Sequence, residues 1–263
     1  MVFVDLKNIC AMMRYIVFLF LLLFSVPQSQ AGINVSHYYS QRDTAGTTTS
    51  GGSAALSVLS NVNTSGSSLI VVAVHSYGVA TAPTLTDNQG NSYGAGQLAA
   101  SADAPSSGPR LRVWYIYGNG IGSATHTFSV TTSAPGFRTI YVVTATGTMF
   151  TADPKDQVTT SSIVGMPNPS VTPSQDNELV LSFVTSSPNA VAPTLSGSFT
   201  LMNSWGFLSS GSFLGADAYL IQTAASTATP VFNYSGVNSA AATISFKAAP
   251  SNNTSNFFNL LLR

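Results

Sequence analysis

From Ile33 to Ala249 the chain alternates runs rich in Val, Ile, Thr, Tyr and Phe with clusters of Gly, Pro, Asn, Asp and Ser. Short runs bounded by such clusters are typical of β-strands. No segment keeps the apolar period of about 3.6 residues that a surface helix requires. The pattern therefore predicts strands at residues 34–40, 53–61, 68–77, 83–87, 92–99, 111–118, 125–132, 138–146, 157–163, 169–173, 178–186, 193–201, 213–223, 229–235 and 240–248.

Short phrases recur in the same order along the chain and indicate an internal repeat. Residues 69–85 align with residues 179–195 at an offset of 110, and four later matches have offsets between 104 and 112. Among these, NSYG at 91–94 matches NSWG at 203–206, and the dipeptide TI at 139–140 matches TI at 243–244. Regular strand spacing with polar turns is typical of a β-sandwich or barrel. We predict two seven-strand units at about residues 53–147 and 169–249.

The two units are compatible with tandem immunoglobulin-like domains or with one sandwich in which each half supplies part of both sheets. The join at residues 153–156 has no long linker rich in glycine, serine or proline. We therefore favour a single domain over residues 32–249, an all-β antiparallel β-sandwich that is jelly-roll-like. The strand at residues 34–41 precedes the repeat, and we expect it at a sheet edge.

The first 31 residues have the order of a secretory signal peptide. Arg14 precedes the uncharged stretch at residues 15–26, and Pro27 and small residues follow it. This stretch is too short to span a bilayer as a helix, so we expect cleavage near Gly32, a secreted and extracellular protein, and no membrane span afterwards. Cys10 lies before the cut, so the mature chain would have no cysteine. Residues 250–263 form a separate C-terminal tail.

Charge is scarce: only 7% of residues are Asp, Glu, Lys or Arg, where soluble domains carry about 25%. The formal net charge is zero, and 38 Ser and 28 Thr make up a quarter of the chain. A nucleic-acid partner is excluded, because phosphate recognition needs a basic surface. An uncharged polar surface suits a neutral polymer or another copy of the chain as partner.

Candidates for catalysis are few. His37, His75 and His126 have none of the spacings that zinc motifs require. Of the carboxylates, Asp217 is the least ordinary, because it lies among small residues inside a predicted strand, and Glu178 opens another. Most others, Asp87 included, lie in predicted turns, where calcium binding is a weaker alternative to a hairpin turn. We expect no enzyme, catalytic residue, metal or cofactor; an unrecognised hydrolase is the least favoured alternative.

Several of these phrases occur together in a known group of proteins. They are SLIVVAV at 68–74, TDNQGNSY at 86–93, VWYIYGNG at 113–120, NELV at 177–180 and AATISFKAA at 241–249. Over residues 45–249 the chain resembles exported bacterial and phage-associated β-sandwich modules, which often accompany surface proteins or extracellular glycan-active enzymes. The resemblance implies an accessory, binding or adhesive role, and it carries no catalytic residues.

Aromatic and polar side chains together suit sugar recognition. Strand alternation puts Trp114 on one face with Arg112. We expect that face to be wet, with Trp114 as a partly exposed platform. The alternative is that Trp114 packs beneath a neighbouring strand. Tyr93 and Trp205 occupy equivalent places in the two units, and Phe207 lies in an apolar, glycine-rich loop. We predict a glycan-binding or adhesive module that uses these five residues. The alternative is a filament or surface-layer subunit that self-associates through the edge strand at residues 34–41.

Overall fold

The computed structural model describes residues 32–42, 56–78, 82–105, 108–132, 136–187, 191–207, 213–235 and 238–250. The predicted signal peptide and nearly all of the C-terminal tail lie outside these ranges. The elements are β1 (Asn34–Arg42), β2 (Leu56–Val62), β3 (Leu69–Tyr77), β4 (Thr84–Asp87), the 3-10 turn η2 (Ala95–Gln97), β5 (Leu98–Asp103), β6 (Arg110–Tyr117), β7 (His126–Thr131), β8 (Phe137–Thr146), β9 (Lys155–Val164), β10 (Glu178–Ser187), β11 (Thr194–Ser196), β12 (Thr200–Phe207), β13 (Phe213–Gln222), β14 (Val231–Asn233) and β15 (Asn238–Phe246).

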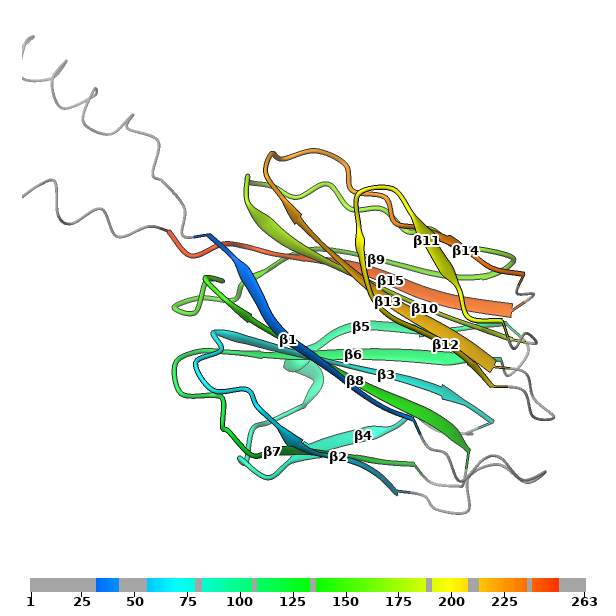
Figure 1. Ribbon diagram of the computed structural model, residues 1–263, viewed down its shortest axis with the longest axis horizontal. Helices are drawn as coiled ribbons and strands as arrows, with labels where there is room; N and C mark the ends of the chain where they lie inside the picture. Colours follow the sequence, from blue (N-terminus) through cyan, green and yellow to red (C-terminus); the bar gives the residue numbers. More distant parts are fainter. Residues whose placement is uncertain are drawn as a thin grey trace, which may run out of the picture. The chain divides into compact units, whose positions relative to one another are not determined.

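The strands form two five-stranded and two smaller sheets, and every strand pair is antiparallel (Figure 1). Sheet 1 has the order β1-β8-β3-β6-β5, and sheet 2 has the order β12-β13-β10-β15-β9. The smaller sheets are β2-β7-β4 and β11-β14. The predicted all-β antiparallel class is therefore confirmed. Each large sheet takes its strands from one half of the chain, so the arrangement in which each half contributes to both sheets is not formed.

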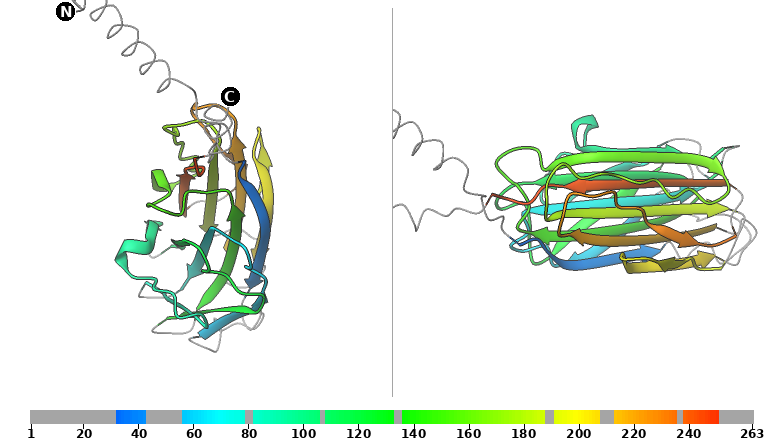
Figure 2. Two further views of the ribbon diagram at one scale, coloured as in Figure 1. Left: turned by 90° about the vertical axis from the view of Figure 1, so that its left-hand side faces the viewer. Right: turned by 90° about the horizontal axis from the view of Figure 1, so that it is seen from above.

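The sheets are stacked in layers (Figures 1 and 2). Three hydrophobic cores fill the spaces between them. The central core lies between sheets 1 and 2 and contains Val71 and Leu181. A second core, with Val72 and Phe128, joins sheet 1 to the three-stranded sheet. A third core, with Phe232, joins sheet 2 to the two-stranded sheet. Sheets 1 and 2 are thus buried on both faces over much of their area.

This layering explains the apolar runs in the sequence. Every residue of β10 is buried, and so is every residue of β3 except Tyr77. A strand covered on both faces places apolar side chains at consecutive positions rather than at alternate ones. The runs LIVVAV and LVLSFV are therefore the central strands of their sheets.

The two large sheets have corresponding strand orders, because β1-β8-β3-β6-β5 corresponds to β9-β15-β10-β13-β12. Leu69 pairs with Tyr117, and Leu179 pairs with Ile221, in agreement with the predicted offsets of 110 and 104. The division into two seven-strand units stays a prediction. The sheets also use β1 and β9, which lie outside the predicted units, and β1 is at a sheet edge as expected.

Strand pairing corrects two of the predicted matches. Leu69 pairs with Ala145 and Leu179 pairs with Phe246, an offset of 101, so the TI match at an offset of 104 is displaced by three positions. The NSYG match is also wrong. NSYG lies in the connection before η2, whereas NSWG lies within β12.

Three predicted strands differ from the structure. Residues 169–173 form no strand, and only an isolated bridge joins Val171 to Ala228. Residues 92–99 form a connection and the turn η2, and β5 begins only at Leu98. Gly94 and Gly96 interrupt this stretch, and glycine disfavours extended strand structure. Residues 193–201 divide into β11 and the start of β12, with Gly197 between them at a φ of +95°.

Candidate functional site

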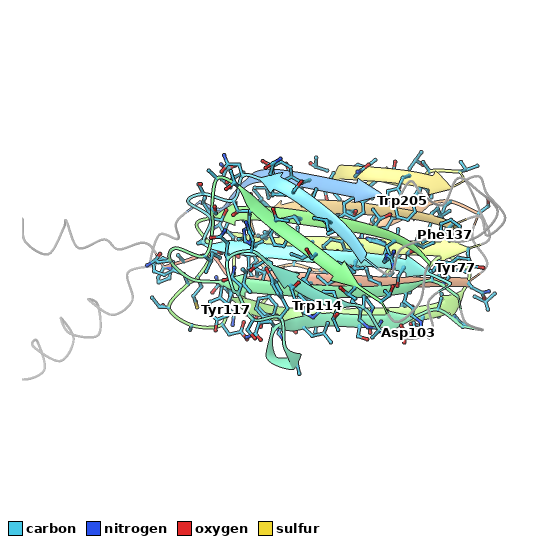
Figure 3. The ribbon with its side chains drawn as sticks, turned by 90° about the horizontal axis from the view of Figure 1, so that it is seen from below. Tyr77, Asp103, Trp114, Tyr117, Phe137 and Trp205 are labelled. Carbon is cyan, nitrogen blue, oxygen red and sulfur yellow. The ribbon has the colours of Figure 1, made fainter. Side chains whose placement is uncertain are left out.

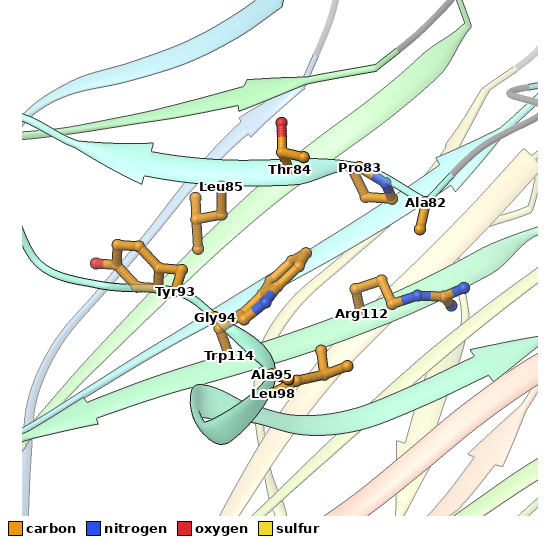
Figure 4. A pocket seen from close by; sticks show the side chains of 10 residues that line it. All are labelled: Ala82, Pro83, Thr84, Leu85, Tyr93, Gly94, Ala95, Leu98, Arg112 and Trp114. Atoms are coloured by element: carbon orange, nitrogen blue, oxygen red, sulfur yellow. The ribbon is translucent and has the colours of Figure 1, made fainter.

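Three of the five predicted binding residues line one pocket, here called the Trp114 pocket. It has a volume of about 390 Å³ and lies between β4, the connection before η2, and strands β5 and β6 (Figure 4). Its lining residues are Ala82, Pro83, Thr84, Leu85, Tyr93, Gly94, Ala95, Leu98, Arg112 and Trp114. The walls are largely apolar, and Trp114 lies in the middle of the labelled side chains in Figure 4. A mostly apolar hollow with a few polar groups is the usual form of a small-ligand site.

Trp114 forms the floor of this pocket. It lies on β6 opposite Val72 of β3 and belongs to the core beneath the three-stranded sheet. Only 6% of Trp114 is exposed, and Arg112 is buried too. The expectation that this face is wet is therefore wrong, because the β2-β7-β4 layer covers it and sheet 2 covers the opposite face. Trp114 therefore offers only a small part of its surface to a ligand in the pocket, and no broad platform.

The charge of Arg112 is neutralised inside the site. Its guanidinium donates two hydrogen bonds to the carboxylate of Asp103, at 2.6 and 3.0 Å, and others to the carbonyl oxygens of Ala102 and Leu111. These hydrogen bonds hold the pKa of Asp103 below its usual range, against the opposing effect of partial burial. A bidentate pair of this kind fixes the orientation of the arginine. The Trp114 pocket is therefore polar at one side without carrying a net charge.

Tyr93 forms a wall of the pocket and is held by Asp87. The Tyr93 hydroxyl donates to Asp87 Oδ2 at 2.7 Å. Burial, together with this carboxylate, raises the pKa of Tyr93 above its usual range. Asp87 also accepts hydrogen bonds from the backbone N–H and the side-chain amide of Asn91. The segment TDNQGNSY thus forms a loop around the Asp87 carboxylate, which sets the position of the Tyr93 ring.

The same carboxylate anchors His126. His126 Nε2 lies 2.9 Å from Asp87 Oδ2, and His126 Nδ1 lies 2.9 Å from the Thr64 hydroxyl. Burial alone would raise the pKa of Asp87, but hydrogen bonds from His126, Asn91 and Tyr93 outweigh it and hold the pKa below its usual range. Gly90 has positive φ, which glycine adopts without strain. The turn leads from the three-stranded sheet to sheet 1, however, and is not a hairpin.

Trp205 and Phe207 do not join this pocket. Trp205 is 3% exposed and lies in the core between sheets 1 and 2, away from Trp114 (Figure 3). Trp205 pairs with Gly215, and the corresponding pair in sheet 1 is Ala102 with Leu111, so Trp205 corresponds to Ala102 and not to Tyr93. Phe207 is the last residue of β12 and does not lie in a loop as predicted, and its side chain lies outside the described residues.

A buried hydrogen bond between a histidine and a carboxyl group links the two large sheets, and sequence reasoning did not find the two residues as a pair. His75 of β3 and Asp217 of β13 are both fully buried, with Nε2 and Oδ1 2.9 Å apart. Burial raises the pKa of Asp217, and His75 and Tyr141 oppose this rise. Trp205 meets the His75 ring edge to face. Each residue was notable on its own in the sequence, Asp217 as a carboxylate inside a strand and His75 as a histidine near a strand end. Nothing in the local sequence indicated that the two are in contact. The pair is closed to substrate and has a structural role.

A pair of interacting carboxyl groups, Glu178 and Asp156, lies beside the connection before β10. Glu178 is fully buried, and burial raises its pKa to about 7, with the charge of Asp156 adding to the rise and hydrogen bonds from Ser245 and Gln175 opposing it. Asp156 forms a 3.0 Å ion pair with Lys247. Its pKa is lowered, because hydrogen bonds from Ser174 and this lysine outweigh the effect of burial. The pair is covered, so it does not form an open site for glycoside cleavage.

Comparison with protein-family models, curated proteins and solved structures finds no match for this chain. Within the described ranges, no helix is long and apolar enough to cross a membrane. In the same ranges, no three His, Cys, Asp or Glu side chains come together as a metal site would need.

Proposed function

We propose that the protein is a secreted, non-catalytic β-sandwich module that binds a neutral glycan in the Trp114 pocket. The observation that carries the proposal is the meeting of Trp114, Tyr93 and Arg112 in one hollow. All three belong to the five residues that the sequence pattern indicates for sugar recognition. Secretion is supported by the order of residues 14–31.

The chemistry of the pocket favours a neutral and partly apolar ligand. Arg112 is the cation among the described lining residues, and its guanidinium is already paired with Asp103, which disfavours an anionic ligand. Sugar rings present apolar C–H faces together with hydroxyls. The exposed part of Trp114 and the Tyr93 ring suit those faces. The hydroxyl of the exposed rim residue Thr84 donates to the Thr131 carbonyl oxygen and can accept a hydrogen bond from a sugar hydroxyl.

A non-catalytic role agrees with the state of the titratable groups around the site. The two carboxylates at the pocket, Asp87 and Asp103, both have pKa values below the usual range and both accept hydrogen bonds. Neither is suited to act as a general acid near neutral pH, which requires a raised pKa. The group with a pKa near 7, Glu178, lies in the other half of the chain, on sheet 2.

A blocking variant tests the proposal without disturbing the core. Ala95 is an exposed residue of η2 that lines the pocket, and Ala95→Gln extends a neutral side chain there. Ala225→Gln, at an exposed turn outside the pocket lining, is the matched control. On a neutral-glycan array we expect about tenfold weaker retention for Ala95→Gln and unchanged retention for Ala225→Gln. Equal retention of both variants, or no retention of the parent chain on any glycan, would rule the pocket out.

A further inference from the structure

The edge strand β9 is unusually open. It pairs with β15 on one side, and no described strand pairs with its other side. Residues 157–160 and 162–164 are all exposed, so both faces of the strand meet solvent. Three of the exposed large apolar side chains lie here: Val158 at 43%, Ile163 at 42% and Val164 at 67%.

Each edge strand of the two large sheets contains one bulge in its first half. Bulges interrupt β1 between Val35 and His37, β5 between Leu98 and Ala100, and β12 between Leu201 and Asn203. In β9 the only irregularity lies near its start, opposite the interval between Ile244 and Phe246. Beyond its bulge, β9 continues over residues 158–164, VTTSSIV, without charge or proline. The continuations of the other three edges are shorter, and those of β1 and β5 contain Arg42 and Asp103. Natural edges are normally protected by bulges, charges or proline.

We propose that β9 pairs antiparallel with β9 of a second copy of the chain, about a twofold axis at Ser161. Directly opposite residues in an antiparallel pair lie on the same face of the sheet. This register places Val158 opposite Val164 and Thr159 opposite Ile163, so each exposed apolar residue meets a β-branched partner. Sheet 2 of both copies becomes one continuous ten-stranded sheet.

A second copy fits this edge better than an unrelated strand for two reasons. The bulge-free stretch at residues 158–164 is centred on Ser161, so it can pair with itself over its full length. Each of its apolar residues then lies opposite a β-branched residue of the second copy. It also carries no charge that would repel an identical strand. A twofold pair closes on itself and removes both open edges, whereas head-to-tail pairing with β1 would leave an edge free at each end.

The oligomeric state of the full chain tests this pairing. We expect a dimer by sedimentation velocity that dissociates on dilution. Val164→Lys should weaken it at least about tenfold, because two lysines enter the paired edge. Val191→Lys, at a residue with 68% exposure outside β9, is the matched control and should leave the dimer intact. A chain that stays monomeric at every concentration would overturn the proposal, and open polymers would do the same.

Cross-linking tests the register itself. In a Cys10→Ser background, Ser161→Cys places two thiols across the twofold axis, within the range of a disulfide. We expect a covalent dimer on mild oxidation. Thr200→Cys, on the edge strand β12, should remain monomeric under the same conditions. Equal cross-linking of the two variants would contradict the β9 pairing, and neither result bears on glycan binding in the Trp114 pocket.

Discussion

Glu178 makes the stability of the fold depend on pH in a defined direction. Burial raises its pKa from an ordinary value of 4.5 to about 7. Between these values the folded chain holds a proton that the unfolded chain releases. The contribution of Glu178 to stability is therefore fully present below pH 4.5 and is lost as the pH rises through about 7.

The size of the effect follows from the pKa change. Each pKa unit corresponds to about 1.4 kcal/mol, so the full change corresponds to about 3 kcal/mol. Solvent screening near the end of β10 reduces this, and we expect about 2 kcal/mol. Glu178→Gln keeps the shape of the protonated acid and cannot ionise. The free energy of unfolding of Glu178→Gln, minus that of the parent chain, should rise by about 2 kcal/mol from pH 4.5 to pH 8.

Urea unfolding at a series of pH values measures this difference directly. Subtracting the parent chain at each pH cancels the contributions of groups that titrate alike in both proteins. A difference that stays constant with pH would refute the reasoning, because it would mean that Glu178 ionises in the folded chain as it does in the unfolded chain. A difference that falls with pH would show that its pKa is lowered.

Three further predictions concern stability and are checked by chemical denaturation. His75→Leu should lower the free energy of unfolding by about 3 kcal/mol, because it leaves Asp217 buried without its histidine partner. Adding Asp217→Val should restore most of this loss. A double-mutant cycle with no coupling energy would contradict an interaction between His75 and Asp217. Asp87→Asn should cost about 2 kcal/mol at pH 7, and the cost should shrink below the ordinary Asp pKa of 3.8, where the stabilisation from a lowered pKa is lost; an unchanged cost at pH 3 would argue against it. Gly122→Ala should cost about 3 kcal/mol or more, because a Cβ there would lie 1.8 Å from the Thr64 carbonyl oxygen; a neutral result would show that this loop relaxes freely.

Local pattern was sufficient to predict the central strands and to name three residues that line one pocket. The apolar runs of β3 and β10 mark strands wherever they pack, since both faces are covered. Alternation along β6 correctly put Arg112 and Trp114 on one face. Tyr93 joins them because the turn before η2 folds back over β5 and β6. The residues that hydrogen-bond within that turn belong to the segment TDNQGNSY, which the sequence pattern singles out.

Layer order could not be predicted in the same way. Both faces of β6 are covered, and only the packing of whole sheets determines this. Trp114 is therefore more buried than the alternation along β6 alone indicates. The register of β12 depends on its pairing with β13, which places Trp205 opposite Gly215 and inside the central core. The contact of His75 with Asp217 joins residues 142 positions apart on different sheets, and no local signal specifies such a contact.

The chain contains two tryptophans, which permits the most direct test of the Trp114 pocket. Trp205→Phe leaves Trp114 as the only tryptophan, and its fluorescence then reports on the pocket alone. We predict a saturable change in emission when a neutral oligosaccharide from a panel of glucan, xylan, mannan and chitin fragments is added. Trp114→Phe, which keeps only the core tryptophan, should show no such change. Unchanged emission from the Trp205→Phe variant with every member of the panel, or equal changes in both variants, would contradict glycan binding in the Trp114 pocket.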